Sequence, residues 1–130
     1  MKNHYKRLSY EYYDVTPNGD SNLENCVTRA ITLATRLPYR TVQKLLKLNA
    51  KANQCDCLTE SCYSKLLEDV FGYERYDCDY EYTVQEITDM YYDHIVLMRV
   101  PHHLTISVYG ENFDIFDCTS EAVDCFWVVR

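Results

Sequence analysis

Cys26 is the residue whose type and position most clearly suggest chemistry. It falls in the first turn of a helix predicted to begin near Asn25, directly after a polar stretch at 20–25. Unpaired backbone N–H groups and the positive end of the helix dipole favour the thiolate there, and the thiolate is the nucleophilic form of cysteine. The alternative interpretation is a small buried thiol that packs like alanine.

Two histidines could supply the base for such a thiol. His102 and His103 follow Pro101 and open a strand predicted over 104–109. Adjacent residues of a strand face opposite sides of the sheet, so only one of the two histidines can face Cys26. We favour His103 as the group that takes the proton from the thiol.

A carboxylate is expected beside this histidine. A tight turn predicted at 110–111 joins the histidine strand to a second strand over 112–116. With the turn centred between residues 110 and 111, His103 lies near Asp117, which would orient the imidazole and fix its tautomer. Asp114 lies further up the hairpin and is the weaker candidate.

The elements that must position these residues are helices first and strands second. Apolar residues at helical spacing predict helices, while alternating or continuous apolar runs predict strands. The expected helices cover about 25–37, 41–49, 60–71 and 84–92, and the expected strands cover 95–100, 104–109, 112–116 and 126–129, with a short edge strand near 10–15. This order predicts an α+β fold with helices packed on an antiparallel sheet. We expect one domain over 1–130, with a polar, tyrosine-rich segment at 1–20.

Four segments together resemble a known family. They are Asn25-Cys26-Val27-Thr28-Arg29-Ala30-Ile31, residues 39–46, residues 103–108 and Phe113-Asp114-Ile115-Phe116-Asp117-Cys118. A cysteine at a helix start, a histidine at a strand start and an aspartate after the next strand resemble papain-like cysteine peptidases, in particular small papain-fold proteins of phage and bacteria. The resemblance covers about residues 20–130. It implies Cys26 as nucleophile, His103 as general base and acid, and Asp117 as the residue that orients His103.

The chain departs from the family pattern before the cysteine. Papain-like enzymes usually carry a glutamine several residues upstream, whose amide helps to bind the oxyanion, and residues 1–26 contain no glutamine. Asn22 could supply an amide N–H beside the backbone N–H of Cys26. Asp20, six residues before the cysteine, would repel an oxyanion and lower the activity.

The resemblance implies a thiol-dependent hydrolase of peptide, isopeptide or other amide bonds, acting without a cofactor or a metal ion. The alternative is a catalytically weak or inactive papain-fold module, encoded by a phage, that binds and modulates a host protein. A cell-wall amidase or peptidase with the same triad is a third reading, which the absence of a recognisable export signal disfavours.

Charge and hydrophobicity exclude some classes of binding partner for this chain. The 130 residues carry a formal net charge of −7, which argues against a general nucleic-acid binder. No apolar run approaches the length of a membrane helix, so we expect no membrane partner and a cytoplasmic location, in the host cytoplasm if the protein is viral. The expected partner is a peptide or protein substrate.

The other cysteines and the tyrosines leave alternatives open. Cys55, Cys57 and Cys62, with Cys78 or His94, could bind zinc, although their spacing is not that of a zinc motif and loop thiols are the simpler interpretation. Cys118 and Cys125 could meet across a hairpin as thiols. The tyrosines interleaved with acidic residues at 73–82 could form a recognition surface or a half-exposed loop wrapped round the domain.

Overall fold

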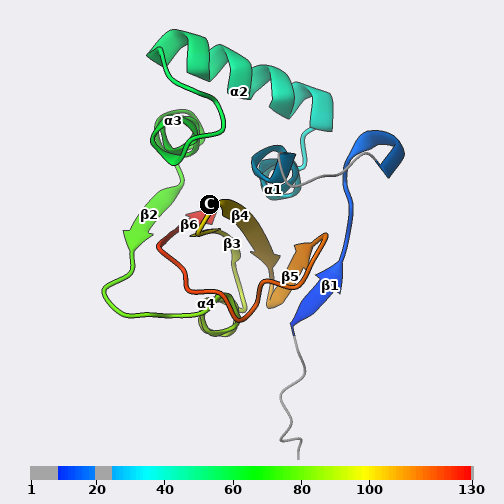
Figure 1. Ribbon diagram of the computed structural model, residues 1–130, viewed down its shortest axis with the longest axis vertical. Coiled ribbons are helices and arrows are strands. Elements are labelled where there is room, and N and C mark those ends of the chain that lie inside the picture. Colours follow the sequence, from blue (N-terminus) through cyan, green and yellow to red (C-terminus); the bar gives the residue numbers. More distant parts are fainter. Residues whose placement is uncertain (1–8, 20–24, 130) are drawn as a thin grey trace, which may run out of the picture.

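The computed structural model of the protein describes residues 9–19 and 25–129 and has the α+β fold predicted from the sequence (Figure 1). The helices are α1 (Cys26–Thr35), α2 (Tyr39–Asn53), α3 (Glu60–Lys65), which continues as a π-helical turn (Leu66–Val70), and α4 (Val84–Met90); a 3-10 turn covers Pro17–Gly19. The strands are β1 (Tyr10–Tyr12), β2 (Glu74–Asp77), β3 (Ile95–Val100), β4 (His103–Val108), β5 (Glu111–Asp114) and β6 (Cys125–Val129).

All of these strands belong to one sheet, in the order β1-β5-β4-β3-β6-β2. The sheet is mixed rather than purely antiparallel as expected, because β1 runs parallel to β5. Strand β2 lies within the acidic, tyrosine-rich segment that we expected to be a loop or a recognition surface, and it pairs with β6. A strand of three charged residues and one tyrosine gives no apolar run by which to recognise it.

Helices cover both faces of the sheet, with α1, α2 and α3 on one side and α4 on the other (Figure 1). Strand β3 shows how the sequence achieves this: Leu97 packs toward α1–α3, whereas Val96 and Met98 pack toward α4. The continuous apolar run of β3 therefore forms a strand buried on both faces, as predicted. Trp127 of β6 is fully buried on the α1–α3 face.

Helix α1 carries the apolar stripe predicted from the sequence. Val27, Ala30, Ile31 and Ala34 are all buried and belong to the cluster beneath α1–α3. The helix ends at Thr35, where Arg36 adopts a left-handed backbone conformation with φ of 61°, and Pro38 begins the turn into α2. The stripe fixes the rotation of α1 about its axis and so fixes the direction in which its first residue faces.

Helix α4 begins with the capping box predicted at Thr83. The Thr83 hydroxyl accepts from the backbone N–H of Glu86, and the Glu86 carboxylate accepts from the backbone N–H of Thr83 at 2.9 Å. In the described ranges, no helix has both the length and the apolar character that a membrane span needs.

The cysteines of the segment between α2 and α3 differ from both expectations. Cys55 and Cys62 form a disulfide that closes a short loop, so they are neither free thiols nor zinc ligands. Cys57, which lies between them in the sequence, is free. Cys118 and Cys125 are also free and buried, but they belong to clusters on opposite faces of the sheet and do not form the expected contact.

The disulfide generates a stability prediction. Cys55→Ser should lower the free energy of unfolding by about 2 kcal/mol, because the bond restricts the unfolded chain over a short loop. Urea unfolding followed by tryptophan fluorescence measures the change. Cys57→Ser is the matched control and should change the free energy by less than about 0.5 kcal/mol. Equal unfolding midpoints for oxidised and reduced wild-type protein would contradict the prediction.

Candidate active site

Cys26 is the first residue of α1, as predicted, and Asn25 is the residue before the helix. Its side chain is buried, with 7% of the residue exposed. The thiol lies beside the imidazole of His103 and the backbone of Leu104, both on β4, and these residues line one cleft with it. The structure therefore brings together the predicted nucleophile and the predicted base from opposite ends of the chain.

The surroundings of Cys26 favour the thiolate. Burial by itself raises the pKa of this thiol, but the hydrogen bonds from His103 and Leu104 and the positive charges of His103 and Arg29 outweigh it. The pKa of Cys26 is consequently below its ordinary value of 9.0. A lowered pKa at a helix start beside a cationic histidine is the environment in which cysteines act as nucleophiles.

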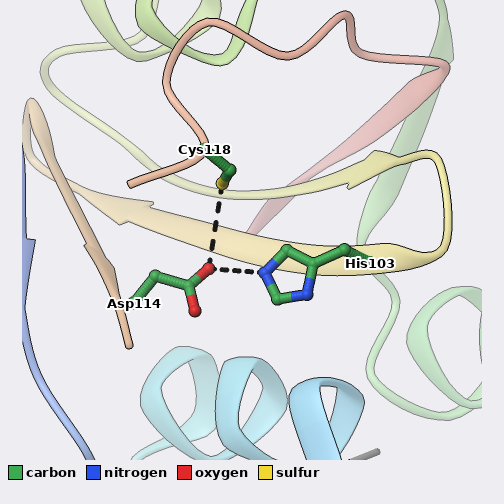
Figure 2. A group of neighbouring side chains, drawn as sticks. All are labelled: His103, Asp114 and Cys118. Carbon is green, nitrogen blue, oxygen red and sulfur yellow. Dashed lines mark hydrogen bonds and ion pairs between the residues drawn. The ribbon is translucent and has the colours of Figure 1, made fainter. Parts of the chain in front are cut away.

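His103 is the first residue of β4 and follows a tight turn in which His102 adopts φ of 59°. Its Nε2 atom lies 2.6 Å from Oδ2 of Asp114, and its side chain is 7% exposed (Figure 2). Burial lowers the pKa of His103, but the hydrogen bond with Asp114 and those with Cys118 and Cys26 raise it to about 11. Asp114 therefore favours the imidazolium form of His103, and the positive charge on His103 in turn favours the thiolate form of Cys26.

Asp114, and not Asp117, holds His103. The carboxylate of Asp117 accepts instead from the backbone N–H and hydroxyl of Thr119, at 2.9 and 2.6 Å. The expected hairpin register was two residues out, because the turn lies at Tyr109-Gly110 and Val108 pairs with Glu111. If this register is extended by one residue, Asp114 lies opposite Thr105. Thr105 is two residues from His103 on β4, so the two share a face of the sheet and Asp114 is the diagonal neighbour of His103.

The carboxylate of Asp114 is the centre of a buried polar network. Oδ2 accepts a hydrogen bond from the Thr105 hydroxyl at 2.6 Å, and Oδ1 accepts from the backbone N–H of Ile115 at 2.8 Å. The Arg29 guanidinium of α1 lies 3.7 Å from Oδ1, and both side chains are at most 5% exposed. Each buried charge thus has an opposite charge beside it, as burial requires.

The first strand holds the backbone of the same residue. The backbone N–H of Tyr13 donates to the Asp114 carbonyl at 2.9 Å, and the Tyr10 hydroxyl donates to the same oxygen at 3.2 Å. These contacts come from the parallel pairing of β1 with β5. The N-terminal segment is therefore part of the support of the site.

Cys118 is a neighbour of His103 and Asp114 that was not among the predicted site residues. Its sulfur lies 3.9 Å from Oδ2 of Asp114, and the ligand atoms of His103, Asp114 and Cys118 lie within 4.8 Å of one another (Figure 2). Such a group could in principle hold a metal ion. However, the buried Arg29 guanidinium against the same carboxylate opposes a further positive charge.

Arg29 and Thr105 were also not predicted. The signal available for the polar network was a set of polar residues at alternate positions of two neighbouring strands: Thr105 and Ser107 of β4, and Asn112 and Asp114 of β5, all of which are buried. Polar residues on strands buried on both faces need partners, which marks these positions as a network.

The thiol and imidazole line a cleft of about 340 Å³. Other lining residues come from α3 and the segment before it, and from the ends of β3 and β4: Leu58, Thr59, Glu60, Tyr63, Arg99 and His102. Two of the charged groups are paired, since Glu60 accepts from Arg75 at 2.6 Å and Arg99 donates to Asp124 at 2.8 Å. Asn22, the expected oxyanion donor, lies outside the described residues, as does Asp20.

Comparison of the chain with models of protein families, with curated proteins and with solved structures gives no match. The arrangement of Cys26, His103 and Asp114 must therefore be interpreted from its own geometry.

The two aspartates of this region generate a paired prediction. Asp114→Asn should slow alkylation of Cys26 by iodoacetamide at pH 7 by about tenfold, because a neutral amide no longer stabilises the imidazolium that holds the thiolate. It should also destabilise the fold by about 3 kcal/mol, since the buried Arg29 guanidinium loses the negative charge beside it. Asp117→Asn is the matched control and should leave the alkylation rate unchanged. Equal effects of the two variants on the rate would contradict the assignment of Asp114.

The lowered pKa of Cys26 predicts a pH profile. In the wild-type protein, the alkylation rate of Cys26 should rise with pH to half its maximum below pH 9. His103→Ala removes the positive partner but leaves the burial, so the midpoint should move upward by more than about 1 pH unit. His102→Ala, which changes the neighbouring histidine, is the control and should keep the wild-type midpoint. A midpoint unaffected by His103→Ala would refute the thiolate–imidazolium pair.

Proposed function

We propose that the protein is a papain-like cysteine hydrolase that cleaves peptide, isopeptide or other amide bonds. The observation that supports this proposal is the grouping of Cys26, His103 and Asp114 at the start of α1, the start of β4 and the end of β5: Cys26 and His103 line one cleft, and His103 is hydrogen-bonded to Asp114. This grouping has a nucleophile, a base and a group that orients the base, which is the general arrangement for covalent catalysis by a thiol.

The proposed reaction begins with the Cys26 thiolate and the His103 imidazolium. The sulfur attacks the substrate carbonyl carbon, a C–S bond forms, and the carbonyl electron pair moves onto oxygen. As the carbonyl re-forms, the C–N bond breaks and His103 gives its proton to the leaving amine. A thioester on Cys26 remains.

Hydrolysis of the thioester restores the enzyme. His103, now neutral, takes a proton from water while the water oxygen attacks the thioester carbonyl. The C–S bond then breaks, the carboxylic acid leaves, and the thiolate and imidazolium are restored. Throughout both steps, Asp114 holds Nε2 of His103, so the other ring nitrogen, Nδ1, remains directed at the reacting atoms.

The proposal predicts which cysteine reacts first with a limiting amount of iodoacetamide at pH 7. Cys57 and Cys78 are more exposed than Cys26, and burial raises the pKa of Cys78. Labelling by exposure would therefore modify Cys57 and Cys78 first, whereas labelling by thiolate content should modify Cys26 first. Peptide mapping by mass spectrometry after short reaction times distinguishes the two orders.

Two variants serve as controls, the first in this labelling assay and the second in a cleavage assay. His103→Ala should slow Cys26 until it labels after Cys57, and Cys26→Ala should abolish cleavage of a protein substrate such as casein. The hydrolase proposal fails if Cys26 labels no faster in the folded protein than in urea and His103→Ala changes nothing. A protein partner captured equally well by wild-type and Cys26→Ala protein would then favour the non-catalytic binding module.

A further inference from the structure

The proposed reaction places a negative charge on the substrate carbonyl oxygen, and this charge needs hydrogen-bond donors. The donor expected from the position of Cys26 is its own backbone N–H, because the first N–H groups of a helix point out of its N-terminal end. A single donor leaves the tetrahedral intermediate incompletely stabilised. A second donor must therefore come from the side chains that line the cleft beside Cys26.

Tyr63 of α3 is a buried residue that lines this cleft. Only 3% of it is exposed, and its ring packs edge-on against Trp127 with the ring centres 5.9 Å apart. The packing fixes the ring, so the direction of the hydroxyl is also fixed. The charged groups that act on the hydroxyl include Arg99, Glu60 and Cys26, which line the same cleft.

Among the described residues, the hydroxyl of Tyr63 has no hydrogen-bond partner, and it is not one of the side-chain atoms shut off from solvent. The hydroxyl therefore opens into the cleft, while the rest of the side chain is buried. Burial also raises the pKa of Tyr63 far above its ordinary value, so the phenol keeps its proton over the whole working range of the site. A neutral O–H with no protein acceptor can donate to an oxygen brought in by the substrate.

We propose that Tyr63 is a catalytic residue whose hydroxyl donates the second hydrogen bond to the oxyanion, beside the backbone N–H of Cys26. This inference rests on the proposed function. The step transfers no proton to the oxygen: the O–H bond stays intact, the hydrogen bond shortens as the charge develops, and it lengthens again when the carbonyl re-forms.

Two reagents separate this role from the reactivity of the thiolate. Acylation of Cys26 by p-nitrophenyl acetate forms a C–S bond at a carbonyl carbon, passes through an oxyanion and releases p-nitrophenolate. Alkylation by iodoacetamide forms a C–S bond at a methylene carbon, releases iodide and forms no oxyanion. Both require the thiolate, and only the first requires the oxyanion donor.

The test compares Tyr63→Phe with wild-type protein in both reactions, following acyl and alkyl groups on Cys26 by mass spectrometry. Tyr63→Phe keeps the ring and its packing, and it should slow acylation about 100-fold while leaving alkylation unchanged. Tyr73→Phe is the matched control, because Tyr73 is buried and stacks on Phe71 but does not line the cleft. It should alter neither rate.

The outcomes distinguish this inference from the proposed function. If Cys26 alkylates rapidly and Tyr63→Phe acylates at the wild-type rate, Tyr63 has no part in the oxyanion site and the hydrolase proposal stands. If Tyr63→Phe slows both reactions equally, Tyr63 acts on the thiolate and the oxyanion role is likewise overturned. If wild-type Cys26 alkylates no faster than in the unfolded chain, both proposals fail together.

Discussion

Two buried cations from separate elements meet one buried anion, the carboxylate of Asp114. Arg29 comes from α1 and His103 from β4, while Asp114 ends β5, and each of these side chains is at most 7% exposed. Removal of the carboxylate would leave both positive charges in a region from which water is largely excluded, which is among the more destabilising changes a fold can undergo. The packing of α1 on the sheet is therefore tied to this one anion.

The same anion governs the chemistry of the site. It keeps His103 charged, and the charge on His103 lowers the pKa of Cys26 despite the burial of the thiol. Fold stability and thiolate formation thus depend on the same contacts. This sharing suits a chain of 130 residues, because a small domain has little room for a separate structural core and a separate polar network.

The parts of this arrangement that depend on local patterns were predictable from the sequence. The stripe that includes Val27 and Ile31, the start of α1 at Cys26 and the start of β4 at His103 all follow from periodicity and from Pro101. The orienting carboxylate was misassigned for two reasons. The turn lies one residue earlier than expected, so the observed register, continued past Asp114, brings residue 116 opposite His103. Asp114 then shares a face with residue 116, whereas Asp117, an odd number of positions away, does not.

Long-range features were beyond prediction for a different reason. The parallel pairing of β1 with β5 and the disulfide between Cys55 and Cys62 join segments whose own sequences carry no mark of their partner. Strand β2 was missed because it lies at the edge of the sheet beside β6 with most of its charged and aromatic residues exposed, so it lacks an apolar face. Burial of Arg29 depends on Asp114, which is 85 positions later in the chain, and no local pattern reports such a contact.

The position of β1 has a practical consequence for handling the protein. Strand β1 covers the outer edge of β5, and Tyr13 and Tyr10 donate hydrogen bonds to the carbonyl oxygen of Asp114. A chain shortened to begin after residue 13 would expose a row of unpaired backbone donors and acceptors along β5. Exposed strand edges of this kind promote self-association. Shortening the N-terminus to aid crystallisation would therefore invite aggregation and loosen the carboxylate on which both cations depend.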